Sequence, residues 1–201
     1  EIKSVSEDAS KPIRTLAVRM IKEQPSKTNH QLVVSVPQVR KPVPLFIVMR
    51  ALGIISDKNI IKTCLLNLKK YENYIDLFIP SVHDAGNIFT QKAALLYIAT
   101  LTKGKTLNHV MNILTNFFLP HIGERNFTAK ALYLGYIVKN LLDVHLGISH
   151  PTDRDSYKFK RMEVSGILLK NLFREYYKKQ QDNIFLKIDK EYFYKHNQSS
   201  Y

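Results

Sequence analysis

The spacing of apolar residues changes at Pro44, and this change restricts the fold more than any other feature of the sequence. Before it, residues 16–20 alternate between large apolar side chains and smaller or charged ones, and residues 31–36 are rich in Val, which predicts two β-strands. The polar residues 23–30 between them are typical of a hairpin loop. After Pro44, apolar residues recur every three or four positions. We therefore expect an α+β, mainly helical fold in which a small β-hairpin or sheet packs on a helical body.

Proline, glycine and capping residues divide the helical part into segments. Pro44 suits the first turn of a helix, and Gly53 suits the position just past its end. Thr90 and Thr106 are expected N-caps, because a Thr hydroxyl can accept a hydrogen bond from a free amide of the first turn. Pro80 is expected to end a short helix. The predicted helices cover residues 45–52, 57–68, 71–79, 91–101, 107–119 and 127–146, and a loop is predicted at residues 83–87. A further long helix is predicted to start near residue 164. Residues 182–194 either extend this helix or form a second one.

The composition and the spacing of potential site residues exclude several classes of protein. The longest apolar runs, such as residues 43–51, fall well short of the ~18 residues that a membrane span needs. The single Cys, Cys64, has no partner for an intrachain disulfide or a Cys-based zinc site and is expected in the core. The seven His residues lack metal-binding spacing, and neither a nucleophile elbow nor a Gly-rich phosphate loop is present. We therefore expect no catalytic residue, metal or cofactor in this chain, no membrane partner, and an intracellular location.

The chain is strongly basic, with 30 Lys and Arg against 17 Asp and Glu and a net charge of +13. A charge of this size suggests a polyanionic partner, most often nucleic acid. The densest run lies at residues 157–179, where seven cations stand beside two Glu and aromatic residues are interleaved. Such cations contact phosphates without reading bases, and aromatic neighbours can stack. The alternative is a solvated helix face with internal ion pairs. The short pair Arg40-Lys41 adds little to this argument.

Two carboxylates, Asp153 and Asp155, stand on either side of Arg154 at the start of this basic region. Carboxylates two residues apart could hold Mg²⁺, as in a polymerase or a glycosyltransferase. The alternative is that they cap a turn and pair with neighbouring cations such as Lys158 or Arg161. Because so many cations are adjacent, ion pairing competes with metal binding, and we favour this second interpretation.

Four segments carry motifs that occur in one order and at characteristic spacing. Residues 43–57 are similar to P-I-hydrophobic-F-R-A-L-G-hydrophobic-x-x-D, residues 118–122 to F-L-P-H-hydrophobic, residues 129–142 to K-A-x-x-L-G-Y-M, and residues 153–161 to D-R-D-H-F/Y-G-x-K-R. Together they resemble the second-largest subunit of multisubunit DNA-directed RNA polymerases of the eukaryotic and archaeal type. The shared order of all four is far more specific than any single match.

This resemblance implies that residues 1–152 form the lobe domain of that subunit, an inserted domain on one side of the polymerase cleft, with residues 1–10 frayed. Residues 153–201 would form a basic segment and helices that return towards the neighbouring protrusion domain. In the family, the lobe helps to form the wall that faces downstream DNA and is a docking surface for initiation factors. The implied partners are the other polymerase subunits, above all the largest, the downstream DNA duplex, and transcription initiation factors.

The resemblance also implies where the chemistry takes place. The catalytic Mg²⁺ of the family is held mainly by aspartates of the largest subunit, so the parent is a nucleotidyltransferase while this piece is expected to have no activity alone. The segment that matches residues 153–161 lies towards the nucleic acid. We expect phosphate contacts from Arg154, Lys158, Lys160 and Arg161, oriented by Asp153 and Asp155.

In the family, His, an aromatic residue and Gly follow the second Asp, and here Ser156, Tyr157 and Lys158 stand in those places, so the chain departs from the pattern at Ser156 and Lys158. Its divergent middle, rich in Lys, Asn and Tyr, suggests a fast-evolving homologue such as the polymerase of a large DNA virus. That origin would place it in the virion or host cytoplasm, and a cellular origin in the nucleus. Because the chain begins at Glu1, we expect a piece of a longer protein.

Three alternatives remain open to the sequence. The first is a free-standing, basic, helical nucleic-acid-binding module, which would bind DNA on its own. The second is a protein-interaction domain with negligible DNA affinity. The third is a metal-dependent enzyme that uses Asp153 and Asp155, and it predicts stabilisation by Mg²⁺.

Overall fold

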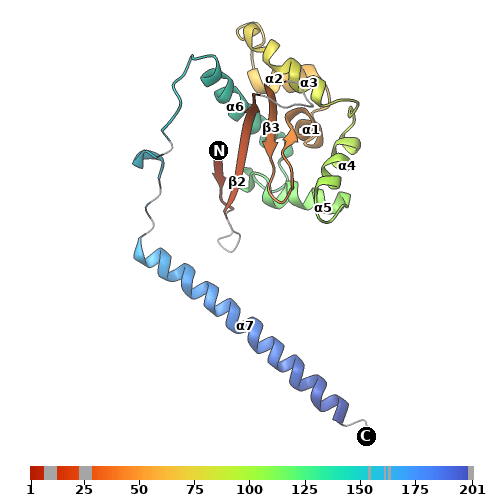
Figure 1. Cartoon of the computed structure of the whole chain (residues 1–201), viewed down its shortest axis with the longest axis vertical. Helices are drawn as coiled ribbons and strands as arrows, with labels where there is room; N and C mark the ends of the chain where they lie inside the picture. Colours follow the sequence, from red (N-terminus) through yellow and green to blue (C-terminus); the bar gives the residue numbers. More distant parts are fainter. Residues whose placement is uncertain (7–12, 23–28, 154, 161, 163, 199–201) are drawn as a thin grey trace. The chain divides into compact units, whose positions relative to one another are not determined.

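A computed structural model of the chain describes residues 1–6, 13–22, 29–153, 155–160, 162 and 164–198. The chain divides into two compact units, unit 1 (Glu1–Pro151) and unit 2 (Thr152–Tyr201). Within the described residues, unit 1 has a four-stranded antiparallel sheet with α-helices around it, and unit 2 has one long helix (Figure 1). This arrangement confirms the expected α+β, mainly helical class.

The sheet of unit 1 contains the predicted hairpin. Its strands follow the order β1 (Ile2–Ser4), β2 (Arg14–Ile21), β3 (Gln31–Ser35) and β4 (Val43–Pro44), and neighbours are antiparallel. Val18 pairs with Val34, so the alternating residues of β2 lie against the Val-rich β3. Four of the five residues of β3 are buried, which is typical of a strand covered on both faces. Residues 23–28 of the expected hairpin loop lie outside the described residues.

The amino-terminal residues form a strand, so the expectation that residues 1–10 are frayed is wrong for the first of them. Ile2 pairs with Leu16 of β2, and Ser4 is buried. The Ser4 hydroxyl lies 2.7 Å from Nδ1 of His121, which is 117 positions away in the sequence. Residues 7–10 lie outside the described residues. A three-residue strand has too few positions to show a periodicity, so the sequence alone did not reveal it.

Side-chain caps start three of the described α-helices of unit 1, including the two predicted at Thr90 and Thr106, whereas Ser56, before α2, makes no capping hydrogen bond. The side-chain oxygens of Thr90, Thr106 and Asn126 accept hydrogen bonds from backbone amides three residues further on, at 3.2, 3.3 and 3.1 Å. Each bond satisfies an amide that the first helical turn leaves free. The helices are α1 (Leu45–Ala51), α2 (Asp57–Leu65), α3 (Ile79–Asp84), α4 (Gln91–Leu101), α5 (Leu107–Asn112) and α6 (Phe127–His145).

Pro80 starts a helix instead of ending one, which corrects the predicted helix over residues 71–79. It lies in the first turn of α3, where its missing N–H leaves no helical hydrogen bond unmade. The preceding residues form two 3₁₀ turns, Glu72–Tyr74 and Asp76–Phe78. Because α3 continues through Asp84, the loop predicted at residues 83–87 begins two residues later than expected.

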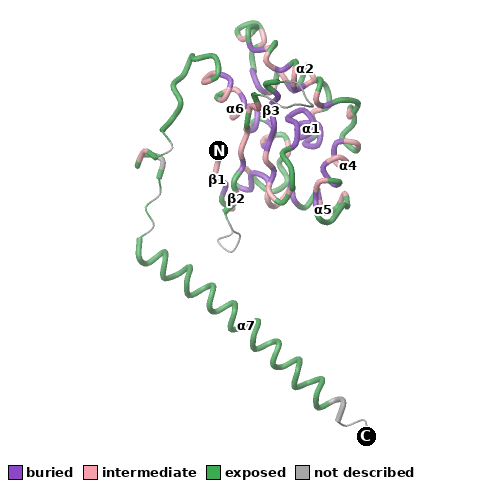
Figure 2. Tube along the Cα trace, in the orientation of Figure 1, coloured by how far each residue is buried: buried purple, intermediate pink, exposed green. Residues whose placement is uncertain are grey.

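The core of unit 1 is built around α1, whose seven residues are all buried (Figure 2). This helix contacts β3 and β4 of the sheet as well as α2, α3 and α4. Burial on all sides explains why residues 45–51 are apolar around almost the whole helix. α2 and α6 pack so closely that a Cβ atom added at Gly135 would lie 2.7 Å from the carbonyl oxygen of Thr63. Cys64 lies in this core, as expected, and burial raises the pKa of its thiol to about 12.

Unit 2 consists of the 3₁₀ turn Tyr157–Phe159 and the helix α7 (Ser165–Gln198). Its 34 residues make α7 about 51 Å long. α7 includes residues 182–194, so the single extended helix is the correct one of the two predicted alternatives. Residues 165–195 are exposed, including large apolar side chains such as Leu172 and Phe173 (Figure 2). None of the described helices is long and apolar enough to cross a membrane.

Candidate nucleic-acid interface

The predicted phosphate-binding segment, residues 153–161, contains a turn followed by a 3₁₀ helix. Oδ1 of Asp153 accepts a hydrogen bond of 2.9 Å from the backbone amide of Asp155, and the amide of Ser156 donates to the Asp153 carbonyl oxygen at 3.3 Å. This is the usual behaviour of an Asp at the start of a turn. The structure places the predicted residues Asp153, Asp155, Lys158 and Lys160 in this one short segment. Arg154 and Arg161, the other two predicted contacts, lie outside the described residues.

Lys160 contacts two of the described side chains of the segment. Its Nζ lies 3.4 Å from Oδ1 of Asp155 and 5.8 Å from the centre of the Tyr157 ring. The two side chains of the ion pair are 48% and 79% exposed, so the pair contributes at most about 1 kcal/mol. A phosphate could therefore replace the Asp155 carboxylate as the partner of Lys160 at little cost. Lys158 and Tyr157 are also exposed.

Of the two carboxylates of the segment, Asp155 makes the contact with a cation that an orienting role requires, and Asp153 instead fixes the turn. Asp153 bonds to the backbone of the turn, and Asp155 pairs with a cation. Nowhere in the described part of the chain do three or more His, Cys, Asp or Glu side chains form a group that could hold a metal ion. The orienting role of Asp153 and Asp155, and the phosphate contacts themselves, stay predictions.

The basic run continues along α7, where an ion pair lies beside exposed aromatic rings. Nζ of Lys179 donates a hydrogen bond of 2.7 Å to Glu175, which lowers the pKa of that carboxyl, and lies 5.2 Å from the centre of the Tyr176 ring. The rings of Phe173 and Tyr177 stack with their centres 6.0 Å apart. This part of α7 thus combines the two alternatives weighed from the sequence, because it has an internal ion pair and also exposed aromatic rings beside cations.

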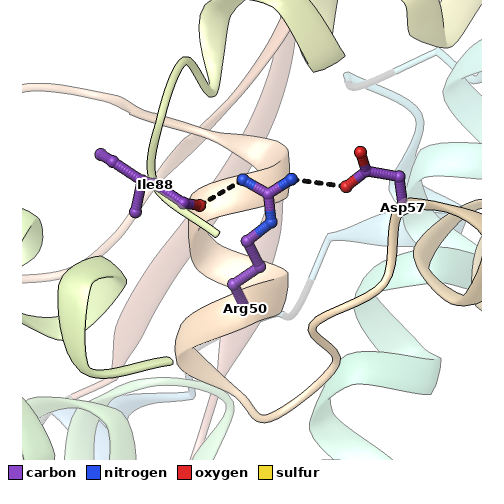
Figure 3. Close-up of polar contacts among 3 residues, drawn as sticks. All are labelled: Arg50, Asp57 and Ile88. Atoms are coloured by element: carbon purple, nitrogen blue, oxygen red, sulfur yellow. Dashed lines mark hydrogen bonds and ion pairs between the residues drawn. The ribbon is translucent and has the colours of Figure 1, made fainter. Parts of the chain in front are cut away.

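Arg50, which sequence reasoning missed, lies at the centre of a polar cluster in the core of unit 1. Figure 3 shows its guanidinium between the carbonyl oxygen of Ile88 and the carboxylate of Asp57. The distance from Nη2 to Oδ1 of Asp57 is 2.5 Å, and the Phe89 ring centre lies 5.3 Å from the guanidinium carbon. The cluster joins α1 to the start of α2 and to the segment before α4. The signal in the sequence was an Arg within an apolar helix and an Asp seven residues later.

Lys130 is a second buried cation that sequence reasoning missed. Its Nζ donates hydrogen bonds to the carbonyl oxygens of Leu114, Thr115 and Glu124 at 2.7, 2.9 and 3.0 Å. Burial lowers the pKa of Lys130 to about 8, because removal from water disfavours the charged form. The three bonds hold the π-helical segment Ile113–Phe117 and the following turn against α6.

His121, in the second of the four motifs, joins the edge of the sheet to α6. Besides its contact with Ser4, its ring packs edge-on against Tyr133 with the ring centres 5.1 Å apart. Partial burial, with a smaller effect from the charge of Lys130, lowers the pKa of His121. The motif residues Arg50, Lys130 and His121 therefore hold the fold together, and the exposed charge lies elsewhere.

Comparison with known sequences gives one family for most of the chain. The sequence model of the family described as RNA polymerase Rpb2, domain 2, matches residues 14–163. This range starts at β2 and includes the predicted phosphate-binding segment.

Individual relatives come from eukaryotes and archaea. The DNA-directed RNA polymerase II subunit RPB2 of Encephalitozoon cuniculi is 38% identical over 187 residues, which cover 89% of this chain and 16% of that protein. The DNA-directed RNA polymerase II subunit 2 of Arabidopsis thaliana is 35% identical over 190 residues, again 89% and 16%. The DNA-directed RNA polymerase subunit Rpo2 of Saccharolobus solfataricus is 33% identical over 152 residues, or 72% and 13%. The chain thus spans only 13–16% of the length of these three relatives.

Proposed function

This chain belongs to the RNA polymerase Rpb2, domain 2, family, and from that premise we propose that it is the lobe domain of the second-largest subunit of a DNA-directed RNA polymerase. The proposed role is to form one wall of the DNA-binding cleft, to support downstream DNA and to offer a docking surface to initiation factors. The match over residues 14–163 carries the proposal, because it includes the folded body and the basic segment in one family.

The proposed mechanism is positional. Unit 1 is suited to a rigid wall because its central helix, α1, is buried on all sides and its buried cations bond across several elements. The exposed Lys158 and Lys160 offer charge to phosphates, which fixes DNA in place without reading its bases. Catalysis and the Mg²⁺ that it uses belong, in this proposal, to the largest subunit, and the chain alone has no activity.

The proposed partners follow from the same assignment. They are the other polymerase subunits, above all the largest, the downstream duplex, and initiation factors. The names of the eukaryotic relatives refer to RNA polymerase II, which favours the nucleus for a cellular parent. The virion or host cytoplasm would be the location for a viral one.

Neutralising the basic segment tests the DNA-supporting role. In the assembled polymerase, Lys158→Gln, Lys160→Gln and Arg161→Gln together should weaken the complex with DNA. The slope of log affinity against log salt should flatten by up to about three units, because each lost phosphate contact removes about 0.9. The matched control replaces three exposed lysines elsewhere in unit 1, Lys58, Lys62 and Lys69, by Gln. An unchanged slope in the first variant, or an equal loss in the control, would refute the assignment.

A free-standing basic module is the second candidate, favoured by the exposed cations and rings of α7. The native parent polypeptide separates the two. The polymerase assignment predicts a parent several times longer than this chain that co-purifies with a still larger subunit. A native product of this chain's own length would instead support the free-standing module.

A further inference from the structure

Two long stretches of the chain contain no Asp or Glu at all. They are residues 24–56 and residues 85–123, and each carries a short pair of cations, Arg40 with Lys41 and Lys103 with Lys105. Cations in such stretches lack a carboxylate close in sequence with which to pair. In the sequence alone, neither pair is long enough to suggest a binding site.

The fold brings the two segments that carry these pairs side by side. Val39 and Thr102 form an isolated antiparallel bridge, and the backbone amide of Arg40 donates a hydrogen bond of 3.1 Å to the carbonyl oxygen of Leu101. Directly opposed residues of an antiparallel pair have Cα atoms about 5 Å apart. The connection between β3 and β4, which carries Arg40 and Lys41, therefore lies against the end of α4, where Lys103 and Lys105 follow (Figure 1).

All four side chains are exposed. Within the part of the chain that the structure describes, none of them has an ion-pair partner. We call this set, Arg40, Lys41, Lys103 and Lys105, the four-cation surface. Because no ion pair among the described residues neutralises these four charges, the surface attracts an anion.

The turn that carries the two lysines is fixed by packing. A Cβ atom added at Gly104 would lie 2.8 Å from the ring of His109, so the backbone of this turn sits directly on that ring. Thr106, two residues after Gly104, caps α5 because its hydroxyl oxygen accepts a hydrogen bond from the backbone amide of His109. The lysines on either side of Gly104 are therefore presented from a defined backbone and not from a loose loop.

We propose that the four-cation surface is a second phosphate-binding site, which contacts backbone phosphates of duplex DNA. The choice of DNA rests on the proposed function, but the residues do not overlap with residues 153–161. Unit 1 has 19 Lys and Arg against 10 Asp and Glu, so +9 of the net charge of +13 lies in unit 1 and not in the basic segment or α7. Arg40 can bind a phosphate through two parallel hydrogen bonds, and the lysines act as point charges.

The main competing occupant is an acidic peptide. A hollow of about 290 Å³ lies beside Lys105 and is lined by Leu96, Ala99, Thr100 and Lys105, and it would suit one apolar side chain of such a peptide. Duplex DNA is favoured over a peptide because only one of the four cations, Lys105, lines the hollow. All four are exposed, so a ligand with a long, regular row of phosphates could contact them all. One strand of DNA carries a phosphate about every 3.4 Å along the axis, so a single duplex can engage several cations at once.

The test compares two variants of the full chain that lose the same number of charges. The first variant combines Arg40→Gln, Lys41→Gln, Lys103→Gln and Lys105→Gln. The control variant combines Lys58→Gln, Lys62→Gln, Lys69→Gln and Lys70→Gln, which are also exposed. Fluorescence anisotropy with a labelled duplex of mixed sequence, repeated over a range of salt, gives the affinity and its slope. Thermal unfolding confirms that each variant is folded.

The first variant should bind at least tenfold more weakly than the wild type, and its salt slope should fall by about three to four units. The control should lose at most about one unit of slope, from the general fall in net charge. Equal losses in both variants, or no loss in the first, would overturn the site. So would a wild-type chain that does not bind duplex at low salt, or one that prefers a poly-glutamate peptide to DNA through these residues.

A third variant keeps this proposal separate from the assignment of the basic segment. Lys158→Gln, Lys160→Gln and Arg161→Gln are combined and measured in the same way. If this variant loses slope and the four-cation variant does not, the proposed function stands and the second site is refuted. The opposite pattern would support the second site and refute the role of the segment.

Discussion

Replacing Asp57 by Ala should destabilise unit 1 only while Arg50 is present. In the wild type, the change leaves the guanidinium of Arg50, which is 1% exposed, without its carboxylate. Removing one partner of a buried ion pair costs about 3–5 kcal/mol. Because the Asp57 side chain is 38% exposed, water can reach that side of the pair, and we expect a loss of about 2–3 kcal/mol.

Arg50→Met removes the buried charge together with its need for a partner. The Asp57 carboxylate then remains hydrated at the surface. The expected cost is about 1 kcal/mol for the carbonyl oxygen of Ile88, which loses its hydrogen bond, and roughly 1 kcal/mol for the small void beside the shorter side chain. In this background, Asp57→Ala should cost less than about 0.5 kcal/mol, which gives a coupling energy of about 2 kcal/mol.

Urea denaturation followed by circular dichroism of the four chains of this double-mutant cycle measures the coupling. With a slope of about 2 kcal/mol per molar urea, Asp57→Ala should lower the midpoint by about 1 M in the wild type and hardly at all in Arg50→Met. Asp76→Ala, at an exposed carboxylate outside the cluster, is the control and should change stability by less than about 0.5 kcal/mol. An equal cost of Asp57→Ala in both backgrounds would show that the pair in Figure 3 does not act as a unit.

Two further predictions concern α6. Gly135→Ala should destabilise unit 1 in urea, because a clash with the Thr63 carbonyl at 2.7 Å, with an overpacking cost of about 1–3 kcal/mol, outweighs a helix-propensity gain of at most about 1 kcal/mol. Gly166→Ala, where nothing lies within 4 Å, is the control, and a more stable Gly135→Ala chain would contradict the close packing. Burial lowers the pKa of Lys130 to about 8 from 10.5, so the unfolded chain holds this proton to higher pH than the folded chain does. The free energy of unfolding should therefore rise by up to about 3 kcal/mol between pH 8 and pH 10 in the wild type relative to Lys130→Met, and parallel curves for the two proteins would refute this.

The elements that were predicted correctly are those that local chemistry specifies. Strands β2 and β3 follow from alternation and Val content, and the starts of α4 and α5 follow from Thr90 and Thr106, whose side chains cap the helix in which they stand. Pro80 was misread because proline both starts and ends helices, and its own sequence neighbours did not decide between the two. β1 was missed because its partners, Leu16 and His121, are distant along the chain.

The candidate site also has a part that the sequence predicts and a part that depends on contacts between distant segments. The basic segment was visible as a run of charge, and those of its residues that the structure describes stay neighbours because they are neighbours in the sequence. The buried roles of Arg50 and Lys130 were not visible, because a cation in an apolar helix gives no indication of which carbonyl or carboxylate will face it. The four-cation surface was not visible either, since it exists only through the bridge between Val39 and Thr102.

The sequence by itself determined the α+β class, most helix starts, the excess of positive charge and, through four motifs in order, the family. These properties depend on residue type, on spacing within one element and, for the family, on the order of motifs along the chain, all of which are present before the chain folds. The tertiary structure alone decided which cations are buried and hydrogen-bonded within the fold and which are exposed on its surface. That decision depends on contacts between segments far apart in sequence, such as Arg50 with Ile88 and Arg40 with Leu101, whose free energies come from burial and hydrogen bonding that no local pattern records.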